Sequence, residues 1–249
     1  MEGNPKIICF TCSWAFPEWE IEAPPNTGVI QVKCIGRLDP IVILESFAKR
    51  VDGIIVIGCS PPDCHFIEGN LYAERTINLL KKVITLAGLE PERLHLELVS
   101  PIENKSFLNL VERFVERIKS LGPLFKGKEV DEEILFNIQA AKQAVTWSRL
   151  RILSGRERKL TEKANAYGEK ISQEEIDRLI EEVMGEEYIR SKIYLLTKEK
   201  PMSVEEISKR IGVDSPLVLQ HIVALRRRGL LAMDRIEGYT PLYRALEVD

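Results

Sequence analysis

Four cysteines follow three short apolar runs, each with the length and composition of a buried β-strand. The runs are Lys6–Phe10, Val29–Val32 and Gly53–Ile57, and the cysteines are Cys12, Cys34, Cys59 and Cys64. If the runs are neighbouring parallel strands, the four thiols converge at the carboxyl edge of one sheet, where open α/β sheets usually bind ligands. Four thiolates suit a soft metal centre, either an iron–sulfur cluster or a structural zinc. The alternative is four separate buried cysteines, because free Cys is among the most buried residue types.

Other residues near these cysteines could support such a centre. Gly36 and Gly58 have no side chain, so the backbone can approach closely and its N–H groups could donate to sulfur atoms. His65 could replace a thiol as a ligand, or it could simply cap a backbone group of the loop. The irregular segment between the first two runs carries Trp14 and Trp19, which could shield a cluster, contact a partner or pack within the loop. Cys9 lies inside the first run and is interpreted as a core residue.

The strand runs alternate with helical patterns, which predicts a parallel sheet with right-handed crossovers. The predicted helices are Pro40–Arg50, Gly69–Ala87 and Glu103–Leu121, and Leu94–Val99 is the predicted fourth strand. The sequence therefore predicts an α/β fold over residues 1–123: a four-stranded, doubly wound parallel sheet, flavodoxin-like in outline. It contains neither G-x-G-x-x-G nor a Walker A motif, so a nucleotide cofactor is not predicted.

The sequence after residue 123 predicts a helical linker and a C-terminal domain. Residues 124–185 form a helical linker, with one long helix around the apolar stripe from Ile134 to Leu150 and a charged helix over Gln173–Met184. Residues 186–249 are similar to a winged helix–turn–helix domain. Its expected elements are a helix over Tyr188–Thr197, a capping box at Ser203–Glu206, a helix over Pro216–Arg228 and a hairpin around Glu237-Gly238.

DNA binding by this last domain is not favoured. From Glu186 to Asp249 there are 11 Lys and Arg against 10 Asp and Glu, so the clear positive excess needed for phosphate binding is missing. The third helix also opens with apolar residues where a DNA-reading helix presents polar ones, which leaves Ser215, Gln220 and His221 as possible base readers. A protein-docking role fits the domain better.

The composition of the chain indicates which classes of protein it can belong to and where in the cell it is expected. The chain has 249 residues, 45% of them hydrophobic, and a net charge of -3, which argues against a general nucleic-acid binder. No apolar run approaches the roughly 20 residues of a membrane span, and the polar N-terminus lacks a signal-peptide pattern. We therefore expect a cytoplasmic protein, where clustered thiols indicate metal binding or catalysis more often than disulfides. The odd count of five cysteines also argues against a disulfide framework.

Four stretches of the first half resemble the delta subunit family of methyl-viologen-reducing hydrogenase, in matching order between Lys6 and Pro123. They are FTC (Phe10–Cys12), CIGRLDP (Cys34–Pro40), GCSPPDCHFIEGN (Gly58–Asn70) and GLEPERLHLELVS (Gly88–Ser100). The resemblance implies a [2Fe–2S] cluster ligated by Cys12, Cys34, Cys59 and Cys64. It also implies a place between a hydrogenase or formate dehydrogenase and the flavin subunit of a heterodisulfide-reductase-type complex. One position departs from the family: Ala15 stands where a second cysteine usually follows the first.

Three functions follow from these observations. The first is an electron-transfer protein without catalysis of its own, which the resemblance favours. The second is a redox-sensing transcription regulator, in which the cluster controls DNA binding by the C-terminal domain. The third is a four-cysteine zinc site with a scaffold role.

Overall fold

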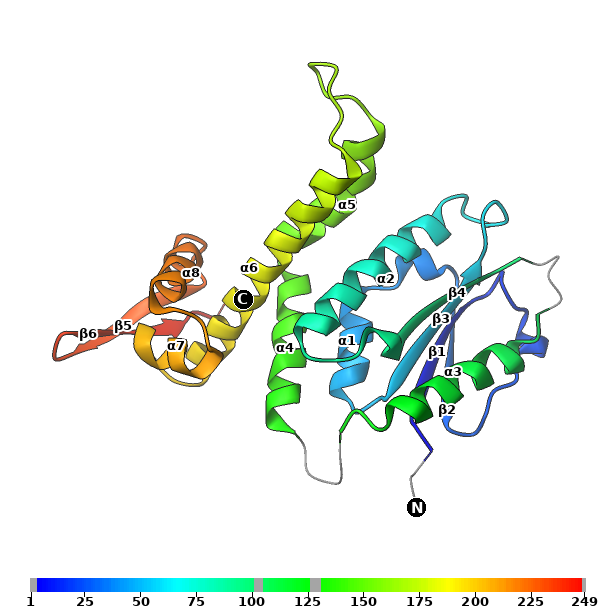
Figure 1. Ribbon diagram of the computed structural model, residues 1–249, viewed down its shortest axis with the longest axis horizontal. Helices are drawn as coiled ribbons and strands as arrows, with labels where there is room; N and C mark the ends of the chain where they lie inside the picture. Colours follow the sequence, from blue (N-terminus) through cyan, green and yellow to red (C-terminus); the bar gives the residue numbers. More distant parts are fainter. Residues whose placement is uncertain (1–3, 101–104, 126–130, 248–249) are drawn as a thin grey trace. The chain divides into compact units, whose positions relative to one another are not determined.

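The computed structural model describes residues 4–100, 105–125 and 131–247 of the chain. The chain folds into two compact units, Met1–Lys142 and Gln143–Asp249, each of which is considered by itself (Figure 1). Among the described residues, no helix has both the length and the apolar character needed to cross a membrane.

The first unit is built on a four-stranded parallel sheet, as predicted. Its strands are β1 (Ile7–Cys12), β2 (Thr27–Val32), β3 (Gly53–Cys59) and β4 (Leu94–Val99), in the order β2-β1-β3-β4. This is the order of the first four strands of a flavodoxin-like sheet. The register pairs Ile7 with Thr27 on one side and with Gly53 on the other. Short 3-10 turns occur at Glu18–Glu20, Ile35–Arg37 and Pro91–Arg93.

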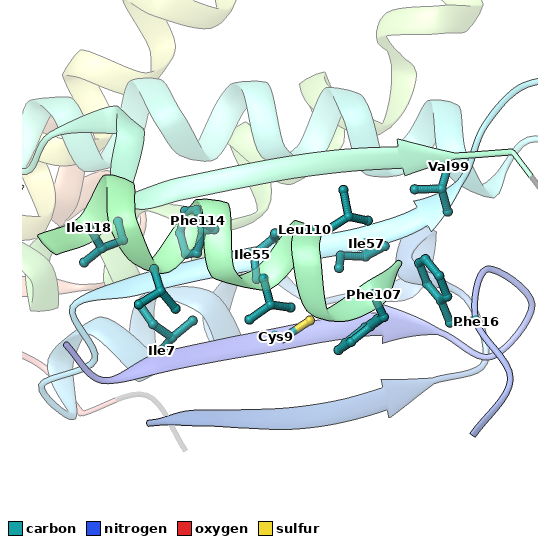
Figure 2. Packing of buried hydrophobic residues seen from close by; sticks show 12 residues of the cluster. Ile7, Cys9, Phe16, Ile55, Ile57, Val99, Phe107, Leu110, Phe114 and Ile118 are labelled. Atoms are coloured by element: carbon teal, nitrogen blue, oxygen red, sulfur yellow. The ribbon is translucent and has the colours of Figure 1, made fainter. Parts of the chain in front are cut away.

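Helices cover both faces of this sheet. α1 (Pro40–Ala48) and α2 (Gly69–Leu86) lie on one face, and α3 (Phe107–Leu121) lies on the other (Figure 1). The predicted third helix began at Glu103, and residues 101–104 lie outside the described residues. Side chains of β1 and β3 pack against α3 in a buried apolar cluster that includes Cys9 (Figure 2). The alternating direction of strand side chains explains this placement, because odd-numbered residues of β1 share one face.

The predicted single long helix over residues 134–150 is wrong. The structure has two helices there, α4 (Glu132–Thr146) and α5 (Ser148–Glu162), separated at Trp147, whose backbone is extended with φ -71° and ψ 144°. The indole of Trp147 packs edge-on against the Tyr194 ring, with the ring centroids 6.0 Å apart, and the Arg228 guanidinium lies over the indole. Tertiary packing of one large ring thus overrides a helical period that the sequence alone would continue.

The two helices predicted over Gln173–Met184 and Tyr188–Thr197 form a single helix in the structure. α6 runs unbroken over 27 residues, Gln173–Glu199, and starts with a capping box between Ser172 and Glu175. Gly185 does not stop the helix, although glycine costs about 1 kcal/mol relative to alanine at such a position. The buried face on both sides of it is continuous, since Val183, Met184, Glu187 and Tyr188 are all buried.

The C-terminal elements occur in the predicted order. α7 (Val204–Ile211) starts at the predicted Ser203–Glu206 capping box, α8 (Ser215–Arg227) follows, and β5 (Leu231–Glu237) pairs antiparallel with β6 (Thr240–Ala245). Glu187 of α6 is fully buried and accepts two hydrogen bonds from the Arg228 guanidinium, at 2.7 and 2.8 Å, and one from Arg190 at 2.6 Å. This ion cluster fixes the C-terminal end of α8 against α6.

Candidate metal centre

The first pair of thiols lies at the ends of the two central strands. β1 ends at Cys12 and β3 ends at Cys59, and these two strands are neighbours in the sheet. After β1 the chain continues to β2 at one edge of the sheet, and after β3 it continues to β4 at the other edge. Such a topological switch point is where open α/β sheets bind ligands. The two Sγ atoms are 3.8 Å apart. Two thiolates bound at about 2.3 Å to one tetrahedral metal ion would lie about 3.8 Å apart, so the pair has the spacing of two ligands on one metal.

The second pair, Cys34 and Cys64, meets at the first residue of α2. Cys34 precedes the Ile35–Arg37 turn, and Cys64 lies in the loop between β3 and α2. Both thiols border Gly69. A Cβ atom added at Gly69 would overlap the Cys34 Sγ atom and would lie 3.4 Å from the Cys64 Sγ atom. The Gly69 backbone therefore forms a cradle in which the Cys34 sulfur packs, with the Cys64 sulfur beside it.

Electrostatics lower the pKa of the Cys12 thiol and raise those of Cys34 and Cys59. A hydrogen bond from Cys59 lowers the pKa of Cys12 to about 6, against the opposing effect of burial and with help from the backbone N–H groups of Trp14, Ala15 and Ile35. Donation to Cys12, together with burial, raises the pKa of Cys59. Burial also raises the pKa of Cys34, although the Gly36 N–H donates to its sulfur. Backbone donors thus already face the sulfur atoms that a metal would bind as thiolates.

Cys9 stands apart from this group, as predicted. Its side chain is buried in the apolar cluster beneath α3, and burial raises its pKa to about 12 (Figure 2). Cys9 is therefore a core residue that stays protonated, and a Cys9→Ala variant is a control for changes at the other four cysteines.

The residues present fit a sulfur-ligated metal group. Cys12 and Cys59 form a close pair, Cys34 and Cys64 both lie at the Gly69 cradle, and the adjacent Asn70 is buried with its side-chain Nδ2 lacking a hydrogen-bond partner. A donor without a partner is unfavourable in a protein interior unless an unseen acceptor satisfies it. In the described part of the chain, no three His, Cys, Asp or Glu side chains are grouped to hold a metal ion. The fit accordingly rests on the two pairs and their surroundings.

Comparison with known proteins places the chain in a family. The family model described as methyl-viologen-reducing hydrogenase, delta subunit, matches residues 7–122. An iron-sulfur subunit of the F420-non-reducing hydrogenase of Archaeoglobus profundus is 39% identical over 129 residues, which is 49% of this chain and 94% of that protein. The chain belongs to the methyl-viologen-reducing hydrogenase delta subunit family.

Two further relatives each match about half of the chain. The vhc iron-sulfur subunit of the F420-non-reducing hydrogenase of Methanococcus voltae is 32% identical over 127 residues, covering 48% of this chain and 88% of that protein. A subunit of the ferredoxin/F420H2-dependent CoB-CoM heterodisulfide reductase of Methanosarcina acetivorans is 34% identical over 136 residues, or 52% of this chain but only 17% of that protein. The match to the family ends at residue 122, so α4 to β6 lie beyond it.

Three positions weighed from the sequence have distinct places in this delta-subunit domain. Ala15 packs its side chain, partly buried, against the apolar cluster and directs its N–H to Cys12. Gly36 lies against the Gly69 backbone, and a Cβ on it would overlap the Gly69 carbonyl. Gly58 is instead close to the Ile35 side chain. Gly36 therefore provides both a close approach and a donor to sulfur, whereas Gly58 provides room for Ile35.

Beside the thiols lies an exposed group of large side chains, here called the apolar patch: Trp14, His65, Phe66 and Ile67. The rings of Trp14 and His65 stack with centroids 3.6 Å apart, and Phe66 packs edge-on against His65. Backbone N–H groups of Trp14 and His65 point to Cys12 and Cys59 respectively. The patch thus borders the thiols and is connected to them through the backbone. Trp19 is also exposed.

Ile67 is the most unusual member of the patch. It is 81% exposed and has φ +67°, a conformation that is strained for a β-branched residue. The turn is fixed by two backbone hydrogen bonds, from Ile67 to the Cys64 carbonyl and from Glu68 to the Phe66 carbonyl. Strain that persists at an exposed apolar residue beside a ligand loop is typical of functional sites.

Three residues of the Gly58–Asn70 motif, Ile67, Gly69 and Asn70, received no role from the sequence. Gly69 matters because of the position of Cys34, which is far away in sequence, and Asn70 because of its unpaired donor. Neither signal exists until the chain is folded. The Gly69-Asn70 pair at the start of an amphipathic helix was the one available hint, since glycine is otherwise unfavourable inside a helix.

Proposed function

We propose that the first unit binds a [2Fe–2S] cluster through Cys12, Cys34, Cys59 and Cys64 and passes electrons between protein partners. The observation that supports the proposal is the 3.8 Å separation of the Cys12 and Cys59 Sγ atoms at the ends of the two central strands, with Cys34 and Cys64 both beside Gly69 at the start of α2. Each pair supplies two ligands, as each iron of such a cluster requires. When bound, the cluster accepts and releases single electrons.

The surroundings of the thiols favour electron transfer. N–H groups of Trp14, Ala15, Ile35, Gly36 and His65 point to the sulfur atoms. Such donors stabilise extra negative charge, so they favour the reduced state and raise the reduction potential. The thiols themselves are mostly buried, which keeps water away from the centre. A cytoplasmic location, where thiols remain reduced, is part of the proposal.

The partners are proposed from the relatives. Related chains are named as iron-sulfur subunits of F420-non-reducing hydrogenases, and a related stretch forms part of a heterodisulfide reductase polypeptide. A domain that is joined to such a polypeptide in one organism is well placed to dock on a separate protein of the same kind in another. We therefore assign a hydrogenase or formate dehydrogenase as the electron donor and a flavin-containing, heterodisulfide-reductase-like protein as the acceptor.

The apolar patch is the proposed contact for one of these partners. Trp14 is 52% exposed and its N–H points to Cys12, so a protein bound there comes within a short distance of the centre. Exposed aromatic side chains are enriched at protein–protein interfaces. Docking at the patch would also exclude water from the thiol edge.

The test is electron transfer by two matched variants. Cys34→Ala removes a proposed ligand, and Cys9→Ala makes the same change at the buried cysteine outside the set. The anaerobically purified chain is reduced and mixed with its heterodisulfide-reductase-like flavoprotein partner, and flavin reduction is followed in a single turnover. We expect the wild-type chain and Cys9→Ala to reduce the flavin and Cys34→Ala to fail. Equal rates for all three would refute the proposal.

A further inference from the structure

The second unit contains an apolar groove between α8 and β5. It has a volume of about 620 Å³ and is lined by Val223, Arg226, Arg227, Leu231, Ala232 and Met233. Leu219 lies one turn before Val223 on the same face of α8. Leu219, Val223 and Met233 are 44%, 38% and 49% exposed, so this side of the unit presents apolar surface to solvent.

The groove also carries uncompensated positive charge. Arg228 is bound to Glu187, and Arg235 is bound to Asp234 and Glu237. By contrast, Arg226 and Arg227 form no ion pair with any residue that the structure describes. From Ser215 to Met233 the sequence holds three arginines and no acidic residue. The surface that covers this groove should therefore combine apolar side chains with carboxylates.

The same unit presents a surface of that kind elsewhere. α5 and α6 pack side by side as a helical hairpin (Figure 1). Between Asn165 and Glu182 the chain has six Asp and Glu residues against two Lys and Arg residues. Large apolar side chains are exposed there as well, namely Tyr167, Ile171 and Leu179. Leu179 has Glu175 and Glu182 as its neighbours on the helix surface, so one apolar side chain is flanked by two carboxylates.

We propose that two copies of the chain associate through these surfaces. The end of the α5–α6 hairpin of one copy, centred on Leu179, occupies the α8–β5 groove of the other. Leu179 packs against Val223 and Met233, and the carboxylates of the hairpin pair with Arg226 and Arg227. A two-fold arrangement uses both surfaces twice, which closes the assembly as a dimer.

DNA is the other ligand class that a basic helix could bind, and the exposed face of α8 argues against it. Its first turns expose Leu217 and Leu219 where base-reading helices present polar side chains. The residues from Glu186 to Asp249 also lack a positive excess, with 11 Lys and Arg against 10 Asp and Glu. Phosphate binding depends on such an excess.

The test is a charge swap on the full-length chain. One variant carries Arg226→Glu and Arg227→Glu, and the other carries Glu174→Arg and Glu182→Arg. Sedimentation velocity is measured for each protein over a wide concentration range at low and high salt. We expect a wild-type dimer that weakens with salt, and dissociation constants at least about tenfold larger for each variant alone.

Mixing the two variants controls for unfolding, because it pairs each altered surface with a complementary one. The mixture is expected to regain the wild-type dissociation constant. A monomeric wild-type chain would overturn the proposal, and so would a dimer that neither variant weakens. A monomer that binds a DNA duplex through Arg226 and Arg227 would also overturn it, in favour of the other ligand class.

Discussion

Replacing Gly69 with alanine tests the cradle beneath Cys34 and Cys64. At an unstrained helix position, Gly→Ala stabilises a protein by about 0.4–1 kcal/mol, mainly through the unfolded chain. At Gly69 the new Cβ would overlap the Cys34 Sγ atom and touch the Cys64 Sγ atom at 3.4 Å. Forcing a methyl group into a packed site costs about 1–3 kcal/mol. We therefore expect Gly69→Ala to lower the free energy of unfolding of the first unit by about 1–2 kcal/mol.

Gly155→Ala is the matched control, because it makes the same change inside α5 where a Cβ would meet no atom within 4 Å. It should raise the free energy of unfolding of the second unit by about 0.5–1 kcal/mol. Hydrogen exchange measured by mass spectrometry on the reduced apoprotein gives the stability of each unit separately.

Iron retention supplies the second readout for this pair. Gly69→Ala should lose iron after anaerobic reconstitution because it displaces the Cys34 thiol, and Gly155→Ala should keep it. If Gly69→Ala were stabilising and retained full iron, the cradle would not exist as described.

Three further outcomes follow from the same structure. Gly36→Ala should abolish iron binding, because its Cβ would overlap backbone of α2, whereas Gly58→Ala overlaps only side-chain atoms of Ile35 and should keep more iron in the same assay. Ile67→Gly removes backbone strain worth about 1–2 kcal/mol, so a denaturant titration should show unchanged or higher stability. The same variant should slow flavin reduction if the apolar patch is the docking contact. Burial opposes ionisation of Glu187, but hydrogen bonds from Arg228 and Arg190 outweigh it and hold the pKa below the usual range. That stabilisation is present above the unfolded pKa of about 4.3 and is lost as the pH falls through the lower folded pKa. Glu187→Gln should therefore lose about 3 kcal/mol at neutral pH and flatten the decline of stability below about pH 4, as measured by urea unfolding.

The positions of Cys12 and Cys59 in the candidate site were predictable because they depend on strand ends. Cys12 and Cys59 close two buried runs, and parallel strands bring their carboxyl ends to one edge. Strand boundaries were less accurate: both cysteines are the last residues of β1 and β3, not residues just beyond them. Cys9 was assigned correctly for the same reason, since its place within a buried run fixes its face.

What depends on contacts between distant residues could not be predicted. The break at Trp147 comes from packing against Tyr194 of another helix, and the continuity of α6 comes from a buried face that extends past Gly185. The positive φ of Ile67 has no sequence signature, since Ile is among the residues least suited to it. Local sequence patterns thus predict which helices and strands form, whereas contacts between distant residues determine where those helices and strands end.

The proposed function depends most directly on what the four thiols hold. The decisive measurement is iron, acid-labile sulfide and zinc content of the anaerobically purified chain, together with the electron paramagnetic resonance spectrum before and after reduction. A [2Fe–2S] centre predicts about two irons and two sulfides per chain and a paramagnetic signal that appears on one-electron reduction. It also predicts that Cys9→Ala keeps the iron, the sulfide and the paramagnetic signal, and that Cys34→Ala loses all three. A colourless protein that contains zinc and gives no signal in either state would contradict it.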